Sequence, residues 1–114
     1  MSQFDEKLSL YKADLDEKLN ISYDAELLEK VTKGLGPSIY NNDSSIVACS
    51  NESEMATVRK NFLIGKLGLA DDETLDEALK AVCEEMGTSN RSKHRAIFYY
   101  LLVKKFNKES IYND

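Results

Sequence analysis

The side chains that most often do chemistry are scarce in this sequence. It holds two cysteines, Cys49 and Cys83, a single histidine, His94, and no tryptophan. A zinc site needs three or four Cys or His ligands, and these three residues are scattered with no paired spacing. The acidic run at 71–77 lacks the alternating ligands and central glycine of a calcium loop. We therefore expect no metal site and no cofactor.

Cys49 is the one candidate for a reactive thiol. It precedes the expected start of a helix, and a helix N-terminus stabilises a thiolate. No partner lies near it in the sequence, so His94 would have to reach it through the fold. The alternative is that Cys49 is simply buried, as free cysteines usually are. Cys83 follows Val82 in an apolar stripe and is expected to be packing.

The sharpest feature is an asymmetry of charge near the end of the chain. Residues 91–108 carry six basic side chains and no acidic one. Three of the six lie where the last helix is expected to start, and positive charge there opposes the helix dipole. These three are Arg91, Lys93 and Arg95. A short turn places Glu84 and Glu85 nearby, so an internal match of acid and base is the favoured interpretation.

An external anion is the alternative for the same charges. A basic helix start suits phosphate or an acidic partner, and the loop at 36–50 would add contacts. The candidate residues for binding an anion or a partner are Arg91, Lys93, Arg95 and Ser38. Nucleic acid is not expected, because a net charge of -5 and a pI of about 4.9 oppose contact with phosphates.

The elements that must position these residues are helices. Apolar residues recur at steps of three and four along most of the chain. The five helical segments are expected at about 2–19, 23–33, 52–67, 71–86 and from 88 or 89 to about 107. We expect Ser22 to cap the second segment and Gly34 to end it, because Gly34-Leu35-Gly36 follows a helix and does not complete a nucleotide loop. Ser50 or Asn51 should cap the third.

A long irregular loop, at about 34–51, separates the second and third segments. It holds the only proline, Pro37, which suits a short helical turn through Ile39 and Tyr40. Residues 46–48 fit either an extended piece or another turn. A loop of this length in a compact domain is usually ordered by contacts or functional.

The last segment is apolar on all sides between Ala96 and Val103. A helix of that kind lies at the centre of a core, with a dimer seam as the alternative. Gly65 within the third segment indicates a close approach by another helix. The fold class is therefore all-α: a compact bundle of four to five helices in one domain over 1–114, with 113–114 frayed.

The N-terminal sequence has no basic start and apolar run, so it is not a secretory signal. Ser2 stands where N-myristoylation requires glycine. The longest apolar run, 96–103, has eight residues, far short of the ~20 of a membrane span. We expect a cytoplasmic protein without membrane contact, in which Cys49 and Cys83 are reduced.

Three stretches carry a resemblance: KGLGPSIYN at 33–41, Cys49-Ser50, and TVRKNFL at 57–63. The chain resembles a bacterial family of small helical proteins, of about this whole length, known as a domain of unknown function. The resemblance implies a compact helical fold and a cytoplasmic, bacterial origin. It carries no activity, cofactor or catalytic residue.

These observations favour a small, non-catalytic, cytoplasmic protein that binds another protein or itself. The alternative is a binder of anions or phosphorylated small molecules, using the loop at 36–50 and the start of the last helix. A thiol-dependent enzyme acting through Cys49 ranks third.

Overall fold

A computed structural model describes residues 3–18, 24–35, 39–40, 46–87 and 93–112. Its α-helices are α1 (Gln3–Ala13), α2 (Ala25–Leu35), α3 (Glu52–Thr57), α4 (Glu73–Glu85) and α5 (Arg95–Lys105). Two π-helical segments, η1 (Asp14–Lys18) and η3 (Val58–Lys66), continue α1 and α3, and a 3₁₀ turn, η4 (Glu109–Tyr112), follows α5. The all-α fold class is confirmed: within the described ranges β-pairing is limited to one bridge, between Ile46 and His94.

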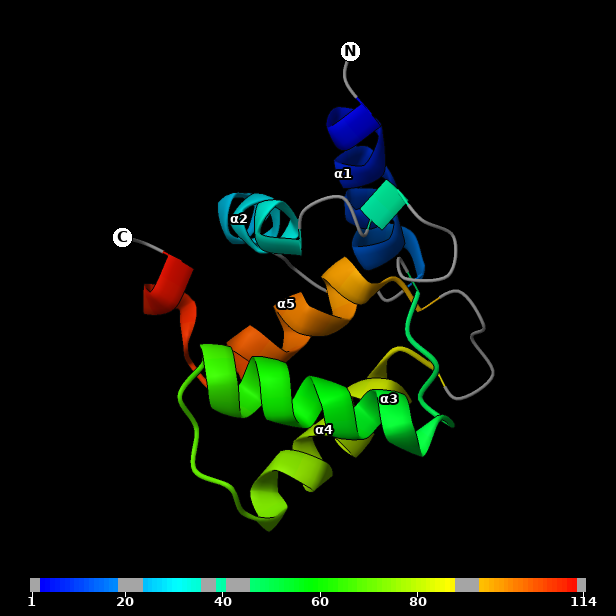
Figure 1. Cartoon of the computed structure of the whole chain (residues 1–114). Helices are drawn as coiled ribbons and strands as arrows, with labels where there is room; N and C mark the ends of the chain where they lie inside the picture. Colours follow the sequence, from blue (N-terminus) through cyan, green and yellow to red (C-terminus); the bar gives the residue numbers. More distant parts are fainter. Residues whose placement is uncertain (1–2, 19–23, 36–38, 41–45, 88–92, 113–114) are drawn as a thin grey trace.

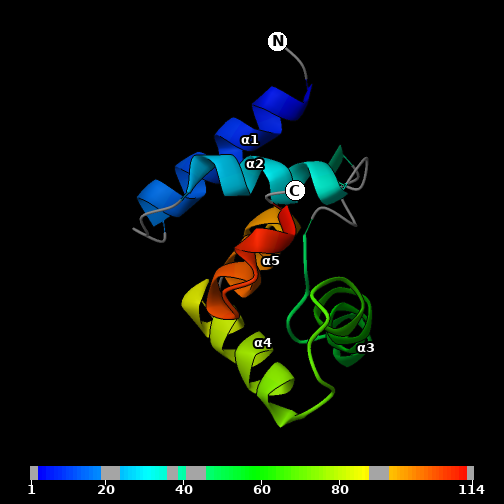
Figure 2. The ribbon, with the colours of Figure 1, turned by 90° about the vertical axis from the view of Figure 1, so that its left-hand side faces the viewer.

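The central helix is α5. Figures 1 and 2 show α1 and α2 on one side of it and α3 and α4 on the other. Helices α2 and α4 contact α5 directly, α1 packs on α2, and η3 packs on α4. The radius of gyration is 13.2 Å, which is the value for a compact domain of this length, about 13 Å.

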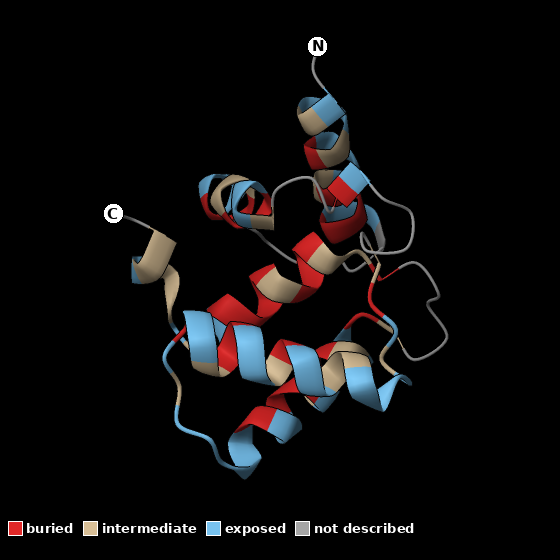
Figure 3. Cartoon of the chain, in the orientation of Figure 1, coloured by how far each residue is buried: buried red, intermediate tan, exposed pale blue. Residues whose placement is uncertain are grey.

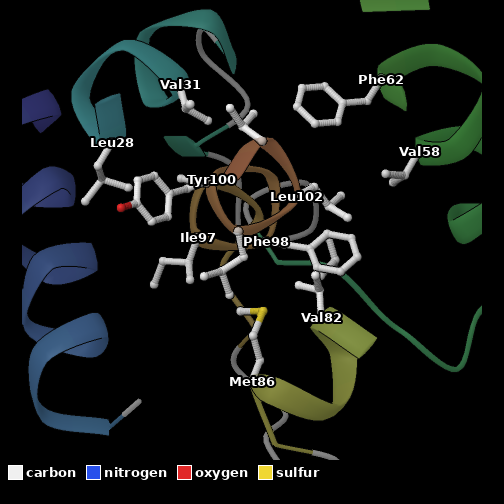
Figure 4. Packing of buried hydrophobic residues seen from close by; sticks show 14 of the residues in the cluster. Leu28, Val31, Val58, Phe62, Val82, Met86, Ile97, Phe98, Tyr100 and Leu102 are labelled. Atoms are coloured by element: carbon white, nitrogen blue, oxygen red, sulfur yellow. The ribbon is translucent and has the colours of Figure 1, made fainter. Parts of the chain in front are cut away.

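The all-round apolar stretch of α5 is buried as expected (Figure 3). Its buried residues are Ala96, Ile97, Phe98, Tyr100, Leu101, Leu102 and Val103. Figure 4 shows Ile97 and Tyr100 on the side of Leu28 in α2, and Phe98 toward Val82 in α4. The hydrophobic core therefore surrounds one helix on several sides.

Several expected helix ends are confirmed. The side chain of Asn51 caps α3 by accepting a hydrogen bond from the Glu54 N–H. Asp72 caps α4 in the same way through Thr74, and its hydrogen bonds from the Thr74 hydroxyl and N–H lower the pKa of Asp72. Gly68 and Gly87, after the third and fourth segments, have φ of 70° and 101°, which favour glycine.

The second segment differs from the expectation at both ends. It begins at Ala25, because the Asp24 carboxylate accepts hydrogen bonds from the N–H groups of Glu26 and Leu27 and so acts as the cap. Ser22 lies outside the described residues. Gly34 does not end the helix but lies within α2, which extends to Leu35.

The prediction that another helix approaches closely at Gly65 is wrong. Gly65 is exposed, and a β-carbon there would lie 3.3 Å from the carbonyl oxygen of Lys60, five residues back in η3. The crowding arises within its own π-helical segment and not from another helix.

The last helix starts later than expected. Lys93 and His94 are extended and precede α5, because the Val47 N–H donates to the Lys93 carbonyl at 2.8 Å and Ile46 pairs with His94. Of the two alternatives for residues 46–48, an extended piece or a turn, the structure thus has the extended piece. The expected start at 88–89 and the expected fraying of 113–114 lie outside the described residues. Among the residues described, no helix is long and apolar enough to cross a membrane.

Truncation of the central helix tests its place in the core. Leu102 is fully buried, so Leu102→Ala should lower the free energy of unfolding by roughly 2 to 5 kcal/mol, measured by urea denaturation. Lys105→Ala, at an exposed position of the same helix, should change it by about 0.5 kcal/mol or less. A loss below about 1 kcal/mol for Leu102→Ala would contradict the central burial of α5.

Candidate functional site

Arg95, one of the three basic residues expected at the start of the last helix, is paired with an acid inside the molecule, but with an unexpected one. The Arg95 guanidinium lies 2.6 Å from a carboxylate oxygen of Glu54, in α3, with side chains 16% and 22% exposed. Glu84 and Glu85, the expected partners, are exposed at the end of α4. The tertiary fold brings α3 to the start of α5, which proximity in the sequence does not reveal.

Glu54 connects three parts of the chain. One carboxylate oxygen accepts from Arg95, and the other accepts from the Ala48 N–H at 3.2 Å. The Glu54 N–H itself donates to the cap residue Asn51. Glu54 was not among the predicted site residues. The signal for it was Asn-x-x-Glu at 51–54, which has the spacing of a capping box and predicts that the glutamate carboxylate folds back toward the start of its helix.

The four candidate anion contacts do not assemble into one open site. Arg91 and Ser38 lie outside the described residues. Arg95 already binds Glu54. Lys93 is only 6% exposed, and its carbonyl oxygen accepts a hydrogen bond from the Val47 N–H. The described part of the candidate set therefore offers little charge to a ligand in solvent.

A second buried polar contact involves His94, the single histidine of the sequence. Its Nε2 lies 3.0 Å from a carboxylate oxygen of Asp14, with side chains 14% and 12% exposed. The Tyr11 ring lies against the imidazole, with centroids 5.1 Å apart. These contacts join α1 and η1 to the start of α5. The signal in the sequence was weak: Asp14 stands between the apolar positions Tyr11 and Leu15 on the inner face of the first helix.

Tyr11 is fully buried, and its hydroxyl has no hydrogen-bond partner among the described residues. Burial, with a smaller contribution from the nearby Tyr40, raises the pKa of Tyr11 to about 12. Burial likewise raises the pKa of Tyr112 to about 12. Both groups are therefore held neutral by the fold at alkaline pH.

The two cysteines are joined in a disulfide, so the expectation of two reduced thiols is wrong for this structure. Their Cα atoms lie 6.2 Å apart across 34 residues. The link connects the turn before α3 to the last turns of α4, and each cysteine is half-buried. Cys83 is thus more than a packing residue, and Cys49 has a sulfur partner other than His94.

Two shallow hollows flank the disulfide. The first, of about 210 Å³, is lined by both cysteines together with Met55, Asp76, Leu79 and Lys80. The second, of about 520 Å³, is lined by Cys49, Glu52, Met55, Ala56, Arg59 and Asp76. Cys49 lies at the boundary of the two.

The acidic start of α4 is paired with a single arginine. Arg59 in η3 forms ion pairs with Asp71 and, at 3.2 Å, with Asp76, and it donates to the Asp72 carbonyl. Its guanidinium is therefore occupied within the fold. No group of three or more Cys, His, Asp or Glu able to hold a metal ion occurs among the described residues.

The fold and these sites define a small helical bundle with an internally neutralised polar interior and a surface disulfide. The chain belongs to the family described as Protein of unknown function (DUF2853), whose model matches residues 10–110. The predicted membership of a family of unknown function that covers nearly the whole chain is thereby confirmed. None of the curated proteins matches this chain.

Glu54 should stabilise the fold through its two hydrogen bonds. Glu54→Gln removes the charge that faces Arg95, so we expect a loss of about 1 to 3 kcal/mol in the free energy of unfolding, measured by guanidinium denaturation. Glu52→Gln, at an exposed position of the same helix, is the matched control and should change little. Equal effects of the two substitutions would contradict the role given to Glu54.

Tyr11 should make the protein less stable at high pH. An unfolded tyrosine loses its proton near pH 10, whereas folded Tyr11 holds it to about 12. Between these values the unfolded state binds fewer protons, so stability falls as the pH rises. Tyr11→Phe should reduce this alkaline loss, and Tyr112→Phe should reduce it separately, in melts from pH 9 to 12. An unchanged alkaline loss in Tyr11→Phe would contradict the assignment.

Proposed function

We propose that this protein is a small, non-catalytic binding protein of the cytoplasm that acts by docking to another protein. The support is the way its reactive groups are used. Arg95 and Arg59 each form an ion pair with a carboxylate of another element, and the His94 ring contacts the Asp14 carboxylate, which ties all three to the architecture. We therefore look for a binding site on the exposed surface, and the outer face of α1 is the best candidate.

The outer face of α1 continues into η1 as one exposed stripe. Its residues recur at steps of three and four and are all exposed: Gln3, Glu6, Leu10, Ala13 and Glu17. Leu10 is 42% exposed, one of the two large apolar side chains most open to solvent in the described part of the chain. The opposite face, with Leu8 and Tyr11, is buried. Figures 1 and 2 show α1 at the edge of the molecule, with its first turns away from the other helices.

The charges of this stripe indicate the kind of partner. Leu10 and Ala13 lie between Glu6 and Glu17, on a chain with a net charge of -5. A second copy, in either orientation, would place glutamates against glutamates, which is unfavourable. The occupant that fits is a protein helix with an apolar stripe flanked by lysine or arginine.

Anion binding and thiol catalysis rank behind this proposal. The Arg95 charge is already matched by Glu54 and Lys93 is buried, which disfavours a phosphate at the start of α5. His94 contacts Asp14, and Cys49 is bonded to Cys83 in a disulfide. Both contacts disfavour a catalytic pair of Cys49 and His94.

The docking face can be tested with a designed helical peptide whose leucine stripe is flanked by lysines. Added to the ¹⁵N-labelled protein, it should shift the amide signals of α1, and Leu10→Asp should weaken binding about tenfold or more. Ala56→Asp, an exposed alanine on α3, introduces the same charge as a matched control and should leave binding unchanged.

Three results would overturn the proposal. The first is an equal loss of binding in the two aspartate variants. The second is a concentration-dependent dimer in sedimentation that Leu10→Asp abolishes. The third is a rise of the melting temperature in millimolar phosphate that disappears with Arg95→Gln, which would favour the anion binder instead.

A further inference from the structure

We propose that Cys49 and Cys83 form a reversible redox modification site, which exchanges with a small anionic disulfide of the glutathione class. The inference rests on the proposed cytoplasmic location, where a disulfide is usually transient or redox-sensing. It does not depend on the docking face of α1.

Non-covalent contacts position both cysteines independently of the bond between them. The turn that carries Cys49 is closed by the Asn51 N–H on the Ala48 carbonyl, and the Ala48 N–H is bound by Glu54. The Val47 N–H just before it is bound to the Lys93 carbonyl. On the other side, Val82 and Met86 anchor the end of α4 in the core around Cys83. Reduction therefore leaves the two sulfurs near one another, because folding itself has already brought the ends of this loop together against the entropic cost of loop closure.

The disulfide is open to a small reactant. Both cysteines are half-buried and line the hollow of about 210 Å³, and Cys49 also lines the adjoining hollow of about 520 Å³. Together these hollows have the size of a small-molecule site. Cys49 lines both hollows whereas Cys83 lines only the first, so we assign Cys49 as the sulfur that exchanges with the reagent.

The hollow that both sulfurs line has one basic side chain, Lys80, and one acidic side chain, Asp76, which is paired with Arg59. Lys80, exposed and three residues before Cys83 on α4, lines the same hollow as both sulfurs. An ammonium group stabilises a neighbouring thiolate and attracts carboxylates of the reagent. The nearby Arg59 is occupied by Asp71 and Asp76, which leaves Lys80 as the cation we assign to the reagent.

The exchange balances in two steps. The Cys49 thiolate attacks one sulfur of the small disulfide, forming a mixed disulfide and releasing one thiolate of the reagent. The Cys83 thiolate then attacks the Cys49 sulfur, forming the bond seen in the structure and releasing the second thiolate. Two protein thiols are oxidised, one small disulfide is reduced to two thiols, and the two protons pass to the released thiolates. Reduction is the reverse.

The test is to equilibrate the full chain with a series of ratios of reduced to oxidised glutathione, trap free thiols by alkylation, and measure intact masses. We expect the wild type to be doubly alkylated at the most reducing ratios and to be an unalkylated disulfide at the most oxidising ratios. The Cys83→Ser variant should instead retain one glutathione on Cys49, and the Cys49→Ser variant should react more slowly. Lys80→Gln should slow formation of the mixed disulfide severalfold, whereas Lys60→Gln, an exposed lysine outside the residues that line the hollows, should not.

A companion measurement separates this proposal from a permanent structural disulfide. The reduced protein and the double variant Cys49→Ser/Cys83→Ser should remain helical by circular dichroism and melt about 10 °C lower. Loss of the helical signal on reduction, or a disulfide that resists every glutathione ratio in the native protein, would overturn the proposal. So would the absence of glutathione on Cys49 in Cys83→Ser. Peptide binding to α1 is measured on the same samples, so failure of either proposal is seen separately.

Discussion

The fold depends on the burial of one helix on several of its sides. Seven of the eleven residues of α5 are buried, and α2 and α4 each cover one of its faces. Helix α2 covers the side of Tyr100, and α4 covers the side of Phe98. The α2 side is also fixed by a polar contact, because the Tyr100 hydroxyl accepts a hydrogen bond from the N–H of Asp24, the residue that caps α2. A central apolar helix thus dictates a bundle around it.

The start of α5 is where polar groups enter this apolar arrangement. Charges that are largely removed from water must be matched, since an unpaired buried charge costs several kcal/mol. The Arg95 charge is matched by Glu54 from one half of the molecule, and the His94 ring meets the Asp14 carboxylate from the other. The two pairs stand at adjacent residues and tie α3 and α1 to the same point. Arg95, a candidate residue for binding an anion, therefore acts as a joint between helices.

The proposed docking face and the proposed redox site lie at the surface, on opposite sides of α5. The exposed stripe of α1 lies on one side of α5, whereas the Cys49–Cys83 bond lies on the other, between α3 and α4. The turn that carries Cys49 is also held by Glu54, so the thiol pair is connected to the joint at Arg95. A change in the cysteines would reach the centre of the fold through that carboxylate.

The sequence by itself determined the helical class, some helix ends and the central helix. These features depend on local periodicity, on a cap such as Asn51, and on the uniform apolar character of 96–103, all of which act over a few residues. Only the tertiary structure decided the pairs Glu54–Arg95, Asp14–His94 and Cys49–Cys83, whose members are 41, 80 and 34 residues apart. A pattern of a few residues carries no information about contacts at such separations. They arise when packing around α5 brings distant helices together, so the candidate site had to be read from the fold.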